Sequence, residues 1–177
     1  MRPVLTLILL FSLPIFCFAQ RLIPYASYAE FEVGHLKFRK VEGKINGING
    51  EVKFNAENLE DSRFHVCLDA RKISTDNEIR DAYITQPDII DVNKYPEMCF
   101  KSTEIVATGR GHVAKGKLTL NGVSKNIEIP FVFKNQSFIG RFAINRFDFD
   151  IADDYSTFTI DDLVKIQIVV YTVPSLN

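Results

Sequence analysis

Apolar and polar side chains alternate along most of this chain, and one long segment, residues 75–102, interrupts the alternation. A two-residue period is typical of β-strands with one face in a core and the other in water. The alternating stretches are residues 29–33, 41–46, 51–55, 64–70, 98–106, 113–120, 123–133, 138–151 and 164–170. About eight strands or a few more, joined by short turns such as Asn121-Gly122, predict an all-β antiparallel barrel or a sandwich.

Two positions break the strand pattern locally. The apolar parity slips near Asn145-Arg146, which predicts a β-bulge that bends this strand. Pro130 has no N–H to donate to a ladder, so it predicts an edge or a bulge. An exposed edge near Pro130 would permit a homodimer, although nothing in the pattern demands one.

The interrupting segment begins with Thr75-Asp76-Asn77-Glu78, in which an acid follows a hydroxyl three residues later. This is the pattern of a capping box, with Thr75 as the N-cap. Ile79 and Tyr83 then fall on one side of a short helix. We expect this helix to close one end of the barrel.

Residues 1–19 read as a secretory signal peptide, because Arg2 precedes an apolar run that ends at Cys17-Phe18-Ala19. Cleavage after Ala19 would leave residues 20–177 as one periplasmic or secreted domain. The apolar run is short and contains Pro14, so no stable membrane insertion is expected. The formal net charge is −1 and no basic patch stands out, which argues against nucleic acid as a partner.

Two cysteines, Cys67 and Cys99, lie in the predicted domain. Each alternates with inward apolar neighbours, so both would point to the outer side of adjacent strands. An oxidising compartment permits a disulfide between them, and two packed thiols are the alternative. No C-x-x-C spacing suggests redox catalysis.

Enzymatic readings find little support in the sequence. The histidines, His35, His65 and His112, are far apart and lack metal-ligand spacing. No G-x-S-x-G nucleophile motif is present, and the acids between Asp148 and Asp162 do not fit a calcium-binding loop. We therefore expect no catalytic residue, metal site or cofactor.

The inward positions are rich in large apolar side chains, since residues 20–177 contain 12 of the 15 Phe and the chain has no Trp. An eight-stranded barrel is just wide enough to be filled by side chains or to hold one small ligand. The pattern alone leaves a ligand cavity and a solid core equally open.

Several motifs, in order along the chain, resemble those of the YceI-like family of bacterial periplasmic polyisoprenoid-binding proteins. They are Phe31-Glu32-Val33-Gly34-His35, the Gly43–Phe54 hairpin, Thr75-x-Asn77-x-x-Arg80-Asp81, Asp91-x-x-Lys94-Tyr95-Pro96, residues 116–125 and Arg146-Phe147-Asp148-Phe149. The resemblance covers essentially all of residues 20–177. It departs at Tyr83, where the family usually has His, at Ile89-Ile90, which replace a Phe pair, and at Asp150, which replaces a Gly.

The resemblance implies a lipocalin-like barrel whose apolar cavity holds a polyisoprenoid or another long-chain amphiphile, such as a fatty acid, without catalysis. The expected cavity wall consists of inward residues, namely Phe31, Val33, Phe54, Phe64, Leu68, Phe100, Leu118, Phe131, Phe142 and Val164. Candidate polar residues at the mouth are His35, Arg80, Asp81, Tyr83 and Arg146. An Arg could bind a phosphate or carboxylate head group.

Two alternatives stay open. Arg80 and Asp81 would also serve as an ion pair or as caps that hold the helical segment, and we favour that interpretation. The whole domain could be a non-binding structural or stress-associated β domain with a solid core.

Overall fold

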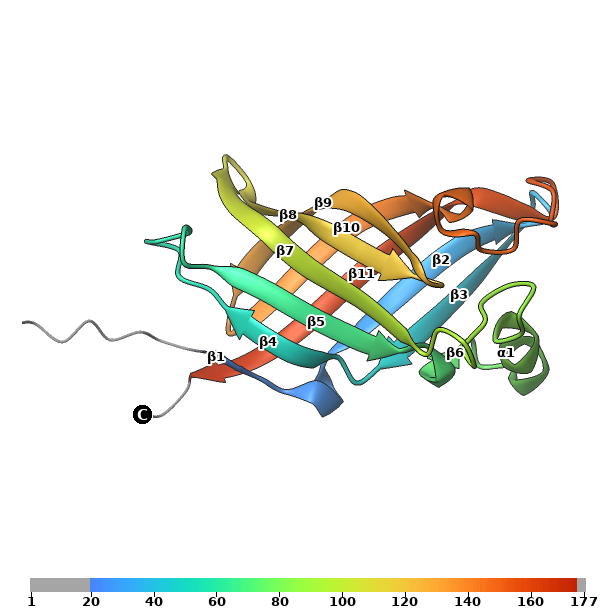
Figure 1. Ribbon diagram of the computed structural model, residues 1–177, viewed down its shortest axis with the longest axis horizontal. Coiled ribbons are helices and arrows are strands. Elements are labelled where there is room, and N and C mark those ends of the chain that lie inside the picture. The colour runs from blue at the N-terminus through green and yellow to red at the C-terminus, as the bar shows by residue number, and fades with distance from the viewer. Residues whose placement is uncertain (1–19, 175–177) are drawn as a thin grey trace, which may run out of the picture.

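The computed structural model describes residues 20–174 and shows an antiparallel β-barrel (Figure 1). The predicted signal peptide, residues 1–19, lies outside the described residues. The strands are β1 (Gln20–Leu22), β2 (Tyr28–His35), β3 (Arg39–Asn46), β4 (Asn49–Lys53), β5 (Arg63–Asp69), β6 (Ile73–Ser74), β7 (Glu97–Thr108), β8 (Gly111–Leu120), β9 (Val123–Lys134), β10 (Ser137–Asn145) and β11 (Ile160–Pro174). The helical turns are η1 (Pro24–Ala26), η2 (Ala70–Lys72), α1 (Glu78–Ile84) and η3 (Arg146–Phe149).

The eleven strands occupy eight positions around the barrel wall. At three of these positions the wall bends, and two separate strands lie one after the other. β1 and β2 share one position, since both pair with β11, β1 at its end and β2 nearer its start. β3 and β4 share the next, where β3 pairs with β2 and β4 with β5. β5 and β6 share the third, and the ring closes where β11 meets β1 and β2. The predicted lipocalin-like antiparallel barrel of about eight strands is confirmed.

Ser27 fixes the elbow between β1 and β2. Its side chain is buried, and its hydroxyl donates to the carbonyl of Ile23 (2.8 Å) and accepts from the N–H of Tyr171 (2.9 Å). The Ser27 carbonyl accepts from the N–H of Gly47 (2.9 Å), at the elbow between β3 and β4. The two neighbouring wall positions therefore bend at the same level.

The helix α1 lies within the segment where the alternation fails, at one end of the barrel (Figure 1). The predicted cap is wrong, because the N-cap is Asn77, whose Oδ1 accepts from the N–H of Arg80 (2.9 Å). Thr75 lies two residues earlier, buried, and its hydroxyl binds side chains of the helix instead. Within residues 20–174, no helix has the length and apolar character needed to span a bilayer.

The parity slip near Asn145-Arg146 marks the end of a strand and not the predicted bulge. β10 ends at Asn145, whose Oδ1 accepts from the N–H of Phe147 (3.1 Å) and so caps the turn η3. Asp150 ends this turn in the left-handed conformation (φ 50°, ψ 42°). That conformation favours glycine, which is the residue the family has at this position.

Pro130 lies at a local strand edge, as its missing N–H predicts. β9 pairs with β8 from Val123 to Phe131, but it pairs with β10 only from Phe131 to Lys134. The ladder to β10 therefore stops at the residue after Pro130. A homodimer through this edge stays a prediction.

Aromatic rings fill the barrel at the end opposite α1. We call this cluster the aromatic plug, and it consists of Phe54, Phe64, His112, Phe131, Phe133 and Phe138. Contacting rings have their centroids between 4.4 and 6.3 Å apart, mostly in the edge-to-face arrangement that aromatic pairs prefer. The plug makes this half of the barrel a solid core.

A disulfide joins Cys67 of β5 to Cys99 of β7, which lie directly opposite each other in the ladder. The neighbouring pair, Val66 and Phe100, points inward, so the disulfide lies on the outer face of the wall. The structure thus contains the bond and not the alternative of two thiols. The bond joins the two ends of the segment that carries α1.

Candidate functional site

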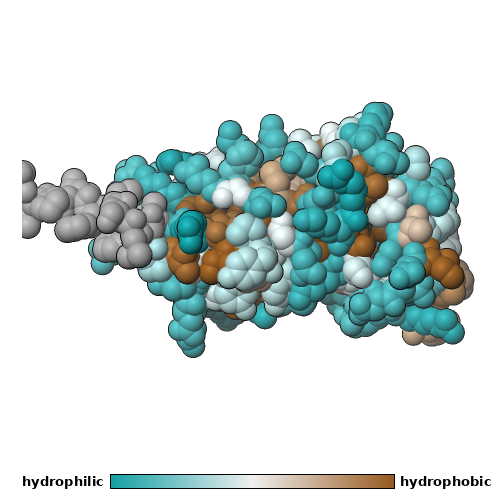
Figure 2. Space-filling view, turned by 90° about the horizontal axis from the view of Figure 1, so that it is seen from below, coloured by the Kyte–Doolittle hydropathy of each residue, from teal (hydrophilic) through white to brown (hydrophobic). Residues whose placement is uncertain are grey.

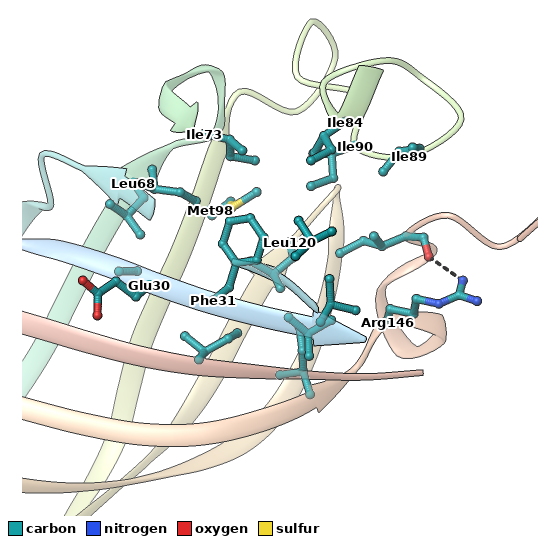
Figure 3. Close-up of a pocket in the computed structure, with 18 of the residues that line it drawn as sticks. Glu30, Phe31, Leu68, Ile73, Ile84, Ile89, Ile90, Met98, Leu120 and Arg146 are labelled. Carbon is teal, nitrogen blue, oxygen red and sulfur yellow. Dashed lines mark hydrogen bonds between the residues drawn. The ribbon is translucent and has the colours of Figure 1, made fainter. Parts of the chain in front are cut away.

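The barrel encloses a cavity of about 480 Å³ between the aromatic plug and α1 (Figure 3). Inward side chains of β2, β3 and β5 to β11 form its wall, and Ile84 of α1 covers it together with Ile89 and Ile90. This volume falls in the range of about 300–1,000 Å³ that is usual for small-molecule sites. Of the two interiors that the sequence left open, the structure has the cavity.

Seven of the ten predicted wall residues line this cavity. They are Phe31, Val33, Leu68, Phe100, Leu118, Phe142 and Val164. Several of them, such as Phe31 and Phe142, are only half-buried although they point inward. This exposure arises because the cavity itself is accessible.

The other three predicted wall residues, Phe54, Phe64 and Phe131, belong to the aromatic plug. Each is buried, and the ring of Phe131 lies 5.7 Å from that of Phe54 and 5.3 Å from that of Phe64. Their inward direction was predicted correctly, but they lie farther along the barrel axis than the cavity. At that level the rings contact one another and leave no space for a ligand.

Further apolar residues of the wall were missed. They include Ile45, Met98, Leu120, Ile144, Ile166 and Ile168. Ile166 and Ile168 follow Val164 at two-residue intervals, so the same alternation could have found them. Ile89 and Ile90 lie in the segment without periodicity, where no comparable signal exists.

The cavity opens to the surface between β3 and α1. Arg39 and Tyr83 line the cavity and are also exposed, which places the opening on this side, whereas the side chain of Lys40 pairs with Glu32 on the outer face. β3 pairs with β6 only at Lys44 and Ile45, and in the described chain its edge from Arg39 to Gly43 has no strand partner on this side. His35 also lines this mouth. Arg39 and Lys40 were not predicted, because nothing in the sequence distinguishes them from other surface cations.

Arg80 and Asp81 both bind Thr75. The Arg80 Nε donates to the Thr75 hydroxyl (2.7 Å) and its Nη2 to the Thr75 carbonyl (2.6 Å). Asp81 Oδ1 accepts from the Thr75 N–H (2.8 Å) and from the Thr75 hydroxyl. Arg80 still lines the cavity, whereas Asp81 does not. These contacts agree with the interpretation that the two residues hold the helical segment.

Arg146 has a role other than the predicted one at the mouth. Its side chain is 1% exposed, and its five N–H groups donate to the backbone carbonyls of Ile151, Ala152, Tyr155, Ile160 and Asp161. Burial lowers the pKa of the guanidinium, although nearby carboxylates oppose this effect. Because no N–H is left for a head group, the residue instead fixes the connection between β10 and β11 (Figure 3).

A pair of tyrosines joins the two segments that cover the open end. The hydroxyls of Tyr83, on α1, and Tyr155, on the β10–β11 connection, are hydrogen-bonded. Tyr155 donates in turn to Asp88 Oδ2 (3.1 Å). The bond to Tyr83, together with burial and the Asp88 carboxylate, raises the pKa of the Tyr155 hydroxyl well above its ordinary value. We call this contact the tyrosine bridge.

The tyrosine bridge should be visible in an alkaline titration. Because the pKa of Tyr155 is raised on folding, its contribution to stability is complete below about pH 10, the ordinary tyrosine pKa, and is lost as the pH rises through the folded value. Ultraviolet absorbance should show late-titrating tyrosines whose amplitude falls by one residue in Tyr155→Phe, because burial and Glu30 also raise the pKa of Tyr28. In Asp88→Asn this component should remain but move to lower pH. A late component of unchanged amplitude in Tyr155→Phe would contradict the bridge.

Known proteins show similarity to the chain in sequence and in fold. The YceI-like domain matches residues 21–172. A UPF0312 protein of Vibrio parahaemolyticus is 34% identical over 132 residues, which are 68% of this chain and 70% of that protein. A UPF0312 protein of Ectopseudomonas mendocina is 30% identical over 139 residues, or 72% of this chain and 73% of that protein.

Two solved structures show the same fold. BcnA of Burkholderia cenocepacia superimposes with a TM-score of 0.77 at 19% identity, covering 85% of this chain and 98% of that chain. A polyisoprenoid-binding domain from Saccharophagus degradans gives a TM-score of 0.67 at 12% identity, covering 89% of this chain and 99% of that chain. At these identities the likeness concerns the fold alone.

Proposed function

Because this chain belongs to the family of YceI-like domains, we propose that its barrel binds and carries a long-chain amphiphile, either a polyisoprenoid or a fatty-acid-like molecule. The observation that carries the proposal is the cavity of about 480 Å³, whose wall is mostly apolar and which opens at one end beside cations. The domain from Saccharophagus degradans, which shares the fold at 12% identity, is described as polyisoprenoid-binding, and the proposed ligand is of the same class.

Apolar contact can supply the affinity. Burying a chain of about sixteen carbons contributes roughly 12 kcal/mol, at about 0.8 kcal/mol per CH₂. Association costs on the order of 4–15 kcal/mol, so at the lower end of this range apolar contact alone gives micromolar binding. Such a wall discriminates poorly between chain lengths, since each methylene adds little. Selectivity must therefore come from the mouth.

The polar groups at the mouth favour an acidic head group. Arg39 is exposed there, and Arg80 lines the cavity nearby. Lys40, the next residue, is paired with Glu32 on the outer face (3.0 Å), whereas Arg39 makes no ion pair among the described residues. A carboxylate or phosphate would bind an Arg side chain through charge-assisted hydrogen bonds. Arg39, and not the predicted Arg146, is thus the arginine that we expect to bind the head group at the mouth.

We favour binding over catalysis and a location outside the cytoplasm. On the described wall, the polar side chains gather at the mouth, so they can orient a ligand but face little of its chain. The signal-like segment supports export, and the Cys67–Cys99 disulfide fits an oxidising compartment.

Native mass spectrometry of the purified protein, followed by organic extraction, tests the proposal. We expect an added mass that is lost on denaturation and that yields a long-chain species in the extract. A bare polypeptide mass, together with no uptake of added prenols or fatty acids, would favour the non-binding structural domain instead.

A further inference from the structure

Three large apolar side chains protrude into solvent at the end of the barrel where the cavity opens. They are Phe38 (93% exposed), Ile79 (85%) and Phe158 (60%), and we call them the apolar rim. They come from the β2–β3 turn, from α1 and from the β10–β11 connection. Figure 1 places these three segments at the same end, and Figure 2 shows apolar surface at the end away from the N-terminus.

Contacts between the segments hold the apolar rim in place. The N–H of Leu36 donates to the carbonyl of Thr159 (3.0 Å), so the β2–β3 turn and the β10–β11 connection are joined beside Phe38 and Phe158. The tyrosine bridge joins the same connection to α1, which carries Ile79. The apolar rim therefore belongs to one connected surface around the mouth.

These three side chains do not contribute to the hydrophobic core. Neither hydrophobic cluster of the described chain includes any of the three. In the β2–β3 turn, Leu36 and Lys37 adopt left-handed conformations (φ 50° and 59°), which are uncommon for residues other than glycine, and Phe38 follows them. A surface with such protruding groups fits an interaction with a partner.

The charges beside Phe38 indicate what this partner is. The turn reads Leu36-Lys37-Phe38-Arg39-Lys40, so cations flank the exposed ring on both sides. Lys37 is paired with Asp161 (3.0 Å) and Lys40 with Glu32 (3.0 Å), which leaves Arg39 to meet an external anion. The other two segments are predominantly acidic, with Asp76, Glu78, Asp81 and Asp88 around α1 and Asp148, Asp150, Asp153 and Asp154 in the β10–β11 connection. The β2–β3 turn and the start of β3 are therefore the one basic side of this end, and it is this side that would face anionic groups.

We propose that the apolar rim docks the open end of the barrel onto the surface of an anionic lipid bilayer. Apolar side chains enter the boundary of the acyl chains while neighbouring cations meet phosphates. Three separate protrusions suit a soft surface better than a second protein, because a stable protein interface needs a well-packed patch of about 800 Å² per partner. The inference rests on the proposed function, since docking would let a chain pass from bilayer to cavity without crossing water.

Vesicle sedimentation tests this proposal with the full chain. We expect binding to vesicles of phosphatidylcholine with phosphatidylglycerol, and weaker binding at high salt or to phosphatidylcholine alone. Phe38→Asp should weaken binding by at least about tenfold, and Ile79→Asp should add to the loss. The matched control is Tyr25→Asp, because Tyr25 is 88% exposed but lies at the elbow between β1 and β2. All three positions are exposed, so the variants should fold.

Other outcomes would overturn the proposal. Equal vesicle binding by Phe38→Asp, Ile79→Asp and Tyr25→Asp would show that the apolar rim does not contact the bilayer. A lipid-free dimer that Phe38→Asp dissociates would assign the surface to a second copy of the chain. Uptake of a soluble fluorescent fatty acid separates the two proposals. Uptake without vesicle binding overturns docking alone, whereas vesicle binding without uptake overturns the proposed function and supports docking.

Discussion

Phe142→Arg is expected to weaken the binding of a long-chain ligand by at least about a hundredfold. Phe142 lies on β10 opposite Ile166 of β11, and both side chains line the cavity. A guanidinium there would be buried against an apolar chain without a counter-charge, at a cost of several kcal/mol. Each 1.4 kcal/mol corresponds to a tenfold loss of affinity.

The described wall offers this guanidinium little compensation. Glu30 is the acidic residue that borders the cavity, but its carboxylate binds Lys44 (3.6 Å) and Gln167 (3.2 Å). Figure 3 shows this carboxylate pointing away from Phe31. Without ligand, water can enter the cavity and solvate the new side chain, so the variant should still fold.

Leu163→Arg is the matched control for this substitution. Leu163 is 55% exposed on β11, next to Val164 in the chain but on the opposite face. Both variants should be titrated with a fluorescent fatty acid and a prenol after circular dichroism has shown that they are folded. Unchanged uptake by a folded Phe142→Arg protein would show that the chain binds outside this cavity.

The direction of the wall side chains was predictable, but their level along the barrel axis was not. Two-residue alternation specifies which face of a strand a residue occupies, and it placed Phe131 and Phe142 correctly on the inner face. Whether an inward ring meets a cavity or other rings depends on the register between strands. In the ladder, Phe131 pairs with His112, another member of the aromatic plug, and with Gly140. No local pattern in the sequence contains that information.

The mouth could be predicted least well, because irregular backbone forms it. Asn77 caps α1 in place of Thr75, since Thr75 is occupied by Arg80 and Asp81. Which residue caps α1 therefore depends on side-chain contacts that form only when the helical segment is packed. The partners of Arg146 are likewise carbonyls of residues 151–161, which a sequence pattern cannot identify.

Removal of the Arg146 guanidinium is expected to give the largest loss of stability among single substitutions near the mouth. In Arg146→Met, five backbone carbonyls lose their donors in a place with little access for water. Each buried acceptor left unpaired costs about 1–3 kcal/mol, and relief from burying the charge offsets part of the sum. We expect the free energy of unfolding, measured in urea, to fall by about 3 kcal/mol or more.

Arg141→Met and Arg146→Lys distinguish the geometry of the guanidinium from its charge. Arg141 lies exposed on β10, the strand that precedes η3, and its Nε donates to Gln167 (2.7 Å), so its loss should change stability by less than about 1 kcal/mol. Lysine keeps the charge but has three donors and no planar fork, so Arg146→Lys should recover only part of the loss. Amide exchange in residues 151–160 should accelerate in Arg146→Met, because their carbonyls hold the connection in place. If Arg146→Met and Arg141→Met unfold at the same urea concentration, the five hydrogen bonds do not stabilise the mouth.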